Sequence, residues 1–169
     1  MLRLMGLAGG MAGALALSQF PEFSQQYLQR LAGKVDALTQ VAAEFDASAQ
    51  QAGLSRDEAL QSLSGSTFAG LHQADMRGTF TELARLQSDL TMLREAGPVE
   101  RTFMPQRFMD PETFSATWGD FRPAVPATTE GIATGAIGYV GGWAAVMVLL
   151  SVLTSPFRAR NRRGSRSRV

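Results

Sequence analysis

A run of 24 residues near the C-terminus, residues 131–154, contains no charged side chain. An α-helix rises about 1.5 Å per residue, so this run spans about 36 Å, enough to cross a hydrocarbon core of about 30 Å. Pro156 follows it and predicts the end of the helix, because proline lacks the N–H that continues the hydrogen-bond ladder. The sequence therefore predicts a transmembrane helix over residues 129–156.

Residues 157–169 form a basic tail that holds six arginines and no acid. A basic segment beside a membrane span stays in the cytoplasm by the positive-inside rule. The tail predicts contact with anionic lipid headgroups, worth about 1 kcal/mol per basic residue near the surface. Docking to an acidic cytoplasmic partner is the alternative, and no nucleic-acid binding is expected. The lipid-contacting residues are predicted to be Arg158, Arg160, Arg162, Arg163, Arg166 and Arg168.

A second apolar segment opens the chain, with no charged residue between Arg3 and Glu22. Residues 1–20 are predicted as a first transmembrane helix, near the lower length limit for a span. A cleaved signal peptide is the competing interpretation, because one basic residue precedes a short apolar core and Ala14 and Ala16 offer a cleavage site. Glycine and alanine are spread through the segment instead of following a leucine-rich core, which favours retention.

Both predicted membrane helices carry glycines four residues apart. Glycine at this spacing clears one helix face, so that two backbones approach closely. Pairing of the two helices with each other is the simplest use, and assembly with other chains is an alternative that does not exclude it. The predicted helix-packing residues are Gly6, Gly9, Gly10, Gly13, Gly131, Gly135, Gly138 and Gly142.

Residues 21–128, between the two predicted spans, have the pattern of two long helices. Apolar residues recur every three or four positions, which indicates one buried stripe on each helix. Gly53 is a predicted helix end and Ser55 with Glu58 a predicted capping box, whereas Gly97-Pro98 ends the second helix. The stripes are Phe20, Phe23, Tyr27, Leu31, Val35, Leu38, Ala42 and Phe45, then Phe68, Leu71, Met76, Phe80, Leu83, Leu86, Leu90 and Leu93.

Neither stripe can be buried by its own helix, so the two helices are expected to pack as an antiparallel hairpin. A segment rich in proline and aromatic residues follows, and Asp110-Pro111 predicts a short helix within it, ending near Trp118. The predicted fold class is therefore all-α: two transmembrane helices flanking an extracytoplasmic antiparallel helical hairpin.

The sequence contains no pattern of residues that indicates a reaction. There is no cysteine and a single histidine, His72, which argues against a metal site. The neighbouring acids Asp57 and Glu58 stand at a predicted helix start, as does Asp110, where the helix dipole favours negative charge without catalysis. We expect no catalytic, cofactor-binding or metal-binding residues, no small-molecule substrate and no enzyme activity.

Two sequence blocks resemble an uncharacterised bacterial family, domain of unknown function 2937 (DUF2937). They are residues 18–31, with Ser-Gln-Phe-Pro-Glu-Phe, and residues 120–131, with Asp-Phe-Arg-Pro-Ala-Val-Pro. The resemblance implies a small Gram-negative membrane protein with a helix at each end, and it supplies no catalytic residue. Both blocks lie at predicted membrane boundaries, so the predicted membrane-junction residues are Phe20, Pro21, Glu22, Phe23, Phe121, Arg122 and Pro123.

The charge distribution completes the prediction. Residues 21–129 contain 14 acidic and nine basic residues, in contrast to the basic tail. This asymmetry predicts a bacterial inner-membrane protein with both termini cytoplasmic and a periplasmic central region. The expected function is an accessory or structural subunit that contacts lipids and a membrane-protein partner or a second copy. A periplasmic sensing module and a lipid-organising, envelope-maintenance protein are the alternatives.

Overall fold

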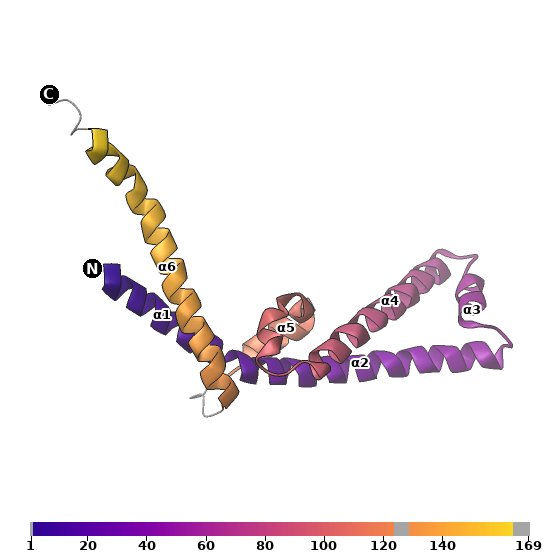
Figure 1. Ribbon diagram of the computed structural model, residues 1–169. Helices are drawn as coiled ribbons and strands as arrows, with labels where there is room; N and C mark the ends of the chain where they lie inside the picture. Colours follow the sequence, from indigo (N-terminus) through magenta and orange to yellow (C-terminus); the bar gives the residue numbers. More distant parts are fainter. Residues whose placement is uncertain (1, 124–128, 164–169) are drawn as a thin grey trace, which may run out of the picture. The chain divides into compact units, whose positions relative to one another are not determined.

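The computed structural model describes residues 2–123 and 129–163, and every regular element in these residues is helical. The chain divides into two compact units (Figure 1). One contains residues 1–23 and 122–169, and the other contains residues 24–121. The all-α prediction is confirmed.

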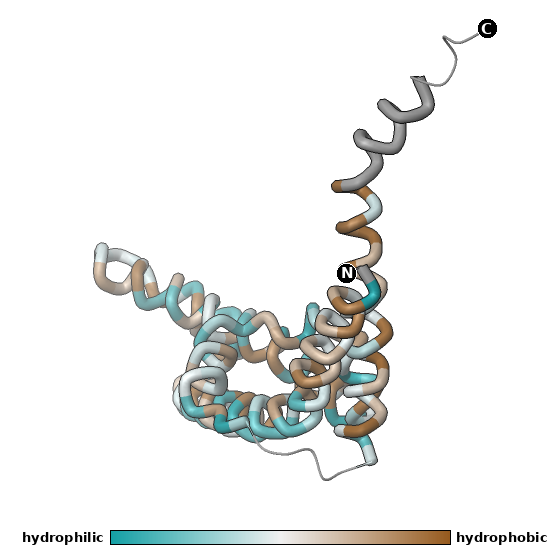
Figure 2. The backbone as a smooth tube through the Cα atoms, turned by 90° about the vertical axis from the view of Figure 1, so that its left-hand side faces the viewer, coloured by the Kyte–Doolittle hydropathy of each residue, from teal (hydrophilic) through white to brown (hydrophobic). Residues whose placement is uncertain are grey.

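The first unit is built on two apolar helices, α1 (Leu2–Ser18) and α6 (Thr129–Arg163). The two helices lie against each other, and both are rich in hydrophobic residues (Figure 2). Within the described residues, one helical segment, Thr129–Leu153, is long and apolar enough to cross a membrane. The 17 residues of α1 fall short of the length of a usual span.

The predicted end of the second apolar helix at Pro156 is wrong, because α6 continues to Arg163. A proline inside a helix removes one backbone hydrogen bond and costs about 3 kcal/mol, but it leaves the rest of the ladder intact. The helix therefore extends into the segment predicted as the start of the tail. The side chains of residues 154–163 and all of residues 164–169 lie outside the described part, and the predicted lipid contacts of the six arginines lie there with them.

The second unit is the helical hairpin. It contains α2 (Phe20–Gln51) from Ser24 onward, followed by α3 (Arg56–Ser62) and α4 (Thr67–Glu95). Gly53 ends the first helix with φ of +73°, a left-handed conformation that favours glycine. The predicted capping box is present: the Ser55 side chain accepts from the Glu58 N–H, and the Glu58 carboxylate accepts from the Ser55 N–H.

Helices α2 and α4 run antiparallel, as predicted. Near the tip the rings of Phe45 and Phe80 are 5.5 Å apart, and further along Gln87 Nε2 donates to Thr39 Oγ1 at 3.4 Å. Residue numbers thus fall on α2 as they rise on α4. The core of this unit is made mainly of the predicted stripes and includes the buried side chains of Tyr27, Leu31, Val35, Ala42, Met76, Leu83, Leu86, Leu90 and Leu93.

The first two residues of the second predicted stripe are not in the core. Phe68 is 79% exposed and Leu71 is 62% exposed, whereas Met76 is buried. The five-residue step from Leu71 to Met76 turns the helix by about 140° from one apolar residue to the next. The stripe therefore changes face at this step, and only the part from Met76 onward points at α2.

Two short 3₁₀ helices, η1 (Glu100–Phe103) and η2 (Pro105–Phe108), lead from α4 to α5 (Pro111–Asp120). The predicted start of α5 is confirmed, because the Asp110 side chain accepts from the Thr113 N–H and Pro111 occupies the first turn. Phe108 is buried with its ring 4.8 Å from that of Tyr27. The segment after α4 is therefore packed onto α2.

Candidate functional site

The backbones of α1 and α6 lie very close together along a row of glycines. We call this contact the glycine seam. A methyl group built at Gly138 would collide with the Gly13 carbonyl group, and one built at Gly142 would collide with that of Gly9. Because the obstructing atoms are backbone, no side-chain rotation relieves the collision. A methyl group at Gly13 would collide with the Gly138 carbonyl oxygen in the same way, so glycine is required at residues 13, 138 and 142 if the two helices are to stay this close. At Gly9 the first obstruction is the Val146 side chain.

Three further glycines complete the seam. Trp143 covers Gly6, Tyr139 covers Gly10, and Gly135 faces Ser18, whose Cβ would be 3.2 Å from a methyl group at residue 135. Residue numbers fall on α6 as they rise on α1, so the helices are antiparallel. The eighth predicted packing residue, Gly131, is buried near the start of α6.

Polar side chains beside the seam are satisfied by their own helices. Thr134 is fully buried and its Oγ1 donates to the Glu130 carbonyl oxygen at 2.9 Å. Ser18 Oγ donates to the Leu15 carbonyl oxygen at 2.9 Å. Both hydroxyl groups therefore have an acceptor without a partner on the other helix.

The outward surfaces of the same two helices are apolar. On α1 the exposed hydrophobic side chains are Leu4, Met5, Leu7, Met11 and Leu15; on α6 they include Ile132, Val140, Val148, Leu149 and Leu153. Gly141 also faces outward, since a methyl group there would meet no atom within 4 Å. Apolar surface of this extent is typical of a site that contacts lipid or another protein.

The predicted membrane-junction residues are divided between the two units, Phe121 belonging to the hairpin and the other six to the unit with the glycine seam. Phe23 is buried, and its ring lies 6.5 Å from that of Phe20. Arg122 and Pro123 are exposed. Their role at a membrane boundary stays a prediction.

In the hairpin unit, the main electrostatic feature is a buried carboxylate, Asp110, which is 2% exposed. Lys34 Nζ donates to it at 3.2 Å and an Arg85 guanidinium nitrogen at 3.1 Å, while the Thr113 hydroxyl donates at 2.6 Å. Burial opposes the charged form, but these donors and the Thr113 N–H outweigh it and lower the pKa of Asp110 to about 2.

The network extends on both sides of Asp110. Lys34 also pairs with Glu82 at 2.8 Å and Glu112 at 3.0 Å, and these bonds outweigh burial and raise the pKa of Lys34 above its ordinary value. Arg107 pairs with Asp89 at 2.7 Å. Each charged side chain of this cluster has a partner of opposite charge. The cluster therefore stabilises the packing of α5 and η2 against α2 and α4, which is a structural role.

The sequence predicted Asp110 as a helix cap but missed its basic partners. Lys34 lies 76 residues away in the chain and Arg85 lies 25 residues away, so no local pattern indicates the pairing. A buried acid is unusual, yet burial itself follows from tertiary packing.

Two acids and the histidine that the sequence analysis considered as possible reactive groups lie at a helix start and on an exposed helix surface. Asp57 and Glu58 stand in the first turn of α3, and His72 is exposed with its ring stacked on that of Phe68. Among the described residues no cluster of three or more histidines or acids could hold a metal ion.

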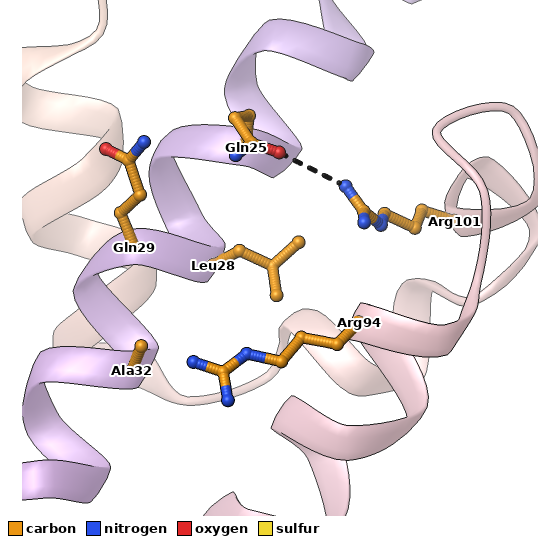
Figure 3. Close-up of a pocket in the computed structure, with 6 residues that line it drawn as sticks. All are labelled: Gln25, Leu28, Gln29, Ala32, Arg94 and Arg101. Carbon is orange, nitrogen blue, oxygen red and sulfur yellow. Dashed lines mark hydrogen bonds between the residues drawn. The ribbon is translucent and has the colours of Figure 1, made fainter.

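A cavity of about 230 Å³ in the hairpin unit was not predicted. It is lined by Gln25, Leu28, Gln29 and Ala32 of α2, Arg94 of α4 and Arg101 of η1 (Figure 3). Arg101 is 9% exposed; its Nε donates to the Leu93 carbonyl oxygen at 2.8 Å and its Nη1 to Gln25 Oε1 at 3.5 Å. The cavity thus brings two arginine side chains, Arg94 and Arg101, to one place.

Comparison with known proteins agrees with the resemblance in the sequence. The model of a family described as protein of unknown function (DUF2937) matches residues 1–159. No curated protein and no solved structure matches the chain. Because the match covers α1, the whole hairpin and α6 as far as residue 159, the chain belongs to the DUF2937 family.

Proposed function

We propose that this protein is a non-enzymatic accessory or structural subunit of a larger inner-membrane complex. In this proposal α1 and α6 cross the membrane together as an antiparallel pair and display the hairpin on the far side. The observation that carries the proposal is the glycine seam. It joins an apolar helix of spanning length to a second, shorter apolar helix through their backbones.

The shortness of α1 is compatible with a span. Its 17 residues cover about 25 Å, a few ångströms less than the hydrocarbon core. Local thinning of the bilayer accommodates such a mismatch at a fraction of a kcal/mol per ångström. Cleavage of a signal peptide near Ala16 would remove one half of the seam, so the seam also supports retention of α1.

The seam glycines pack α1 against α6 within one chain, which leaves the outward surfaces of the two helices for a partner. Seven of the eight predicted packing glycines contact the other helix of the same chain, so that face is occupied. A partner helix must therefore use the outward surfaces, where Gly141 and Val140 are exposed. Of the four glycines at residues 135, 138, 141 and 142 of α6, Gly141 alone has open space beside it, so a second backbone can approach there.

Topology is the first test of this proposal. Arg3 and the arginine tail flank the two helices on one side, so both termini should be cytoplasmic and the hairpin periplasmic. Alkaline phosphatase fused after Ala96 should be active, and the same reporter fused after Val169 should be inactive. The reverse result at either site would contradict the two-span arrangement.

Association is the second test. A tagged chain isolated from membranes in mild detergent should retain one partner at constant stoichiometry, measured by quantitative mass spectrometry. Gly141→Leu should lose that partner, because the new side chain blocks close approach on the outward face. Gly33→Leu is the control, since residue 33 is equally open but lies on α2. Absence of both a stoichiometric partner and self-association would refute the accessory role.

A further inference from the structure

The cavity beside Arg94 and Arg101 is the feature that the proposed function leaves unexplained. Its walls combine two guanidinium groups and two side-chain amides with an apolar surface from Leu28 and Ala32. In Figure 3 the side chains of Arg94 and Arg101 extend from their own elements toward α2. A cavity with this lining offers hydrogen-bond donors to a ligand on one side and apolar contact on the other.

Arg101 is a buried cation that has no anionic partner among the described residues. Its guanidinium group donates hydrogen bonds to two neutral oxygens, those of Leu93 and Gln25, and no acid in the described residues forms a salt bridge with it. Burial lowers the pKa of Arg101, but a guanidinium stays charged in proteins. Burial of an uncompensated charge is costly, so an anion in the cavity would relieve an existing penalty.

Arg94 supplies a second cation at the same cavity. It is exposed, and no described acid forms a salt bridge with it. The basic residues of the Asp110 network differ in this respect, because Lys34, Arg85 and Arg107 all have carboxylate partners in the same unit. Residues 21–129 contain 14 acids, yet none pairs with the two arginines of the cavity within the described structure.

We propose that this cavity binds a small oxyanion, a carboxylate or phosphate group that carries a short apolar substituent. The two guanidinium groups would hold the oxyanion, since their planar N–H groups match such oxygens in pairs. Gln29 would donate from its amide, and the substituent would lie against Leu28 and Ala32. At about 30 Å³ for one water, the cavity has room for roughly seven or eight water-sized groups, the size of a small organic anion or of a lipid headgroup.

The proposal is independent of the accessory-subunit function and adds a ligand that the sequence did not predict. The sequence predicts no small-molecule substrate, and the cavity supplies no group for turnover. Its ligand would be bound and released unchanged. The same oxyanion chemistry has two sources, a free anion in solution and the phosphate of an anionic lipid.

The test uses the full chain purified in a neutral maltoside detergent. Isothermal titration calorimetry should detect binding of sodium phosphate or sodium butyrate, with sodium chloride at equal ionic strength as the blank. Arg94→Gln should weaken binding at least roughly tenfold, because it removes one of the two charge-assisted contacts. Arg94 is exposed and has no structural partner in the described residues, so this variant is expected to fold.

Arg77→Gln is the matched control, since Arg77 is also an exposed arginine of α4 but lies outside the cavity. It should bind as the unmodified protein does. A second variant, Gln29→Ala, should weaken binding several-fold while leaving the circular dichroism spectrum unchanged.

A lipid arm distinguishes the two sources of the anion. The protein is reconstituted in nanodiscs of phosphatidylcholine, with or without phosphatidylglycerol, and hydrogen exchange is measured in peptides covering residues 24–32 and 94–101. Protection by phosphatidylglycerol that Arg94→Gln abolishes, without binding of the free anions, identifies a lipid headgroup. The proposal is overturned if neither free anion binds and protection is equal in both kinds of nanodisc. It is also overturned if Arg77→Gln weakens anion binding as much as Arg94→Gln does.

Discussion

Replacing Gly138 with leucine is expected to separate α1 from α6. Even the first carbon of the new side chain would collide with the Gly13 carbonyl group. Overpacking of a close contact typically costs about 1–3 kcal/mol, and here the obstructing atoms belong to a helix backbone that cannot move aside. A cost of about 3 kcal/mol corresponds to roughly a hundredfold loss of the paired state.

An intramolecular disulfide can measure this loss. The chain contains no cysteine, so Ser18→Cys with Gly135→Cys introduces a unique pair. The Cβ atoms would be 3.2 Å apart, close to the separation of about 3.5–4.5 Å found in disulfides. The double variant should form the disulfide efficiently, which is measured as a loss of thiols that a labelling reagent can modify. Adding Gly138→Leu should lower the disulfide yield at least roughly tenfold.

Gly141→Leu is the control for this experiment, because a side chain at residue 141 would meet no atom within 4 Å. It should leave the disulfide yield unchanged. Equal yields for Gly138→Leu and Gly141→Leu would show that the glycine seam does not hold the helices together. Absence of any disulfide in the double variant, with intact mass showing a chain that starts near Leu17, would show that α1 is removed.

Replacing Asp110 with asparagine is expected to destabilise the hairpin by about 2–3 kcal/mol, near the lower end for breaking a buried ion pair. Asparagine can still cap α5 through the Thr113 N–H, so the loss reports on charge. Lys34 and Arg85 would keep other carboxylate partners, Glu82 and Asp89 among them, which moderates the effect. Urea unfolding of the full chain in detergent, followed by circular dichroism, measures the difference.

Asp120→Asn is the matched control, because Asp120 pairs with Arg30 at an exposed site, where its side chain is 72% exposed. Exposed pairs contribute at most about 1 kcal/mol. The same destabilisation by both variants would contradict the structural role assigned to the network around Asp110.

The pH dependence follows from the direction of the shift. The folded pKa of Asp110 is about 2, below its ordinary value of 3.8, so the folded state binds this proton less readily than the unfolded chain. The stability from Asp110 is present above about pH 3.8 and is lost as the pH falls toward about 2, a change of about 2 kcal/mol. Asp110→Asn should remove this part of the acid dependence, and an unchanged acid profile would contradict the assignment.

The helices and most of their ends could be predicted because their signals are local. Gly53, Ser55 with Glu58, and Asp110 with Pro111 each act on backbone groups within four residues, so a short stretch of sequence contains the whole interaction. The errors arise where a local rule competes with neighbours. Pro156 is tolerated by a long helix, and Phe68 and Leu71 lie beyond the five-residue step that turns the stripe.

The sequence by itself determined that two apolar, glycine-faced helices precede and follow a helical hairpin along the chain, because periodicity, glycine spacing and the absence of charge are properties of contiguous residues. Only the tertiary structure decided that Gly13 meets Gly138, that Asp110 is buried among basic side chains and that Arg101 lines a cavity without an acid. These contacts join residues far apart in the chain: Lys34 to Asp110, and Gln25 to Arg101, are each separated by 76 positions. Burial and pairing over such distances depend on how whole helices pack, which no local pattern specifies.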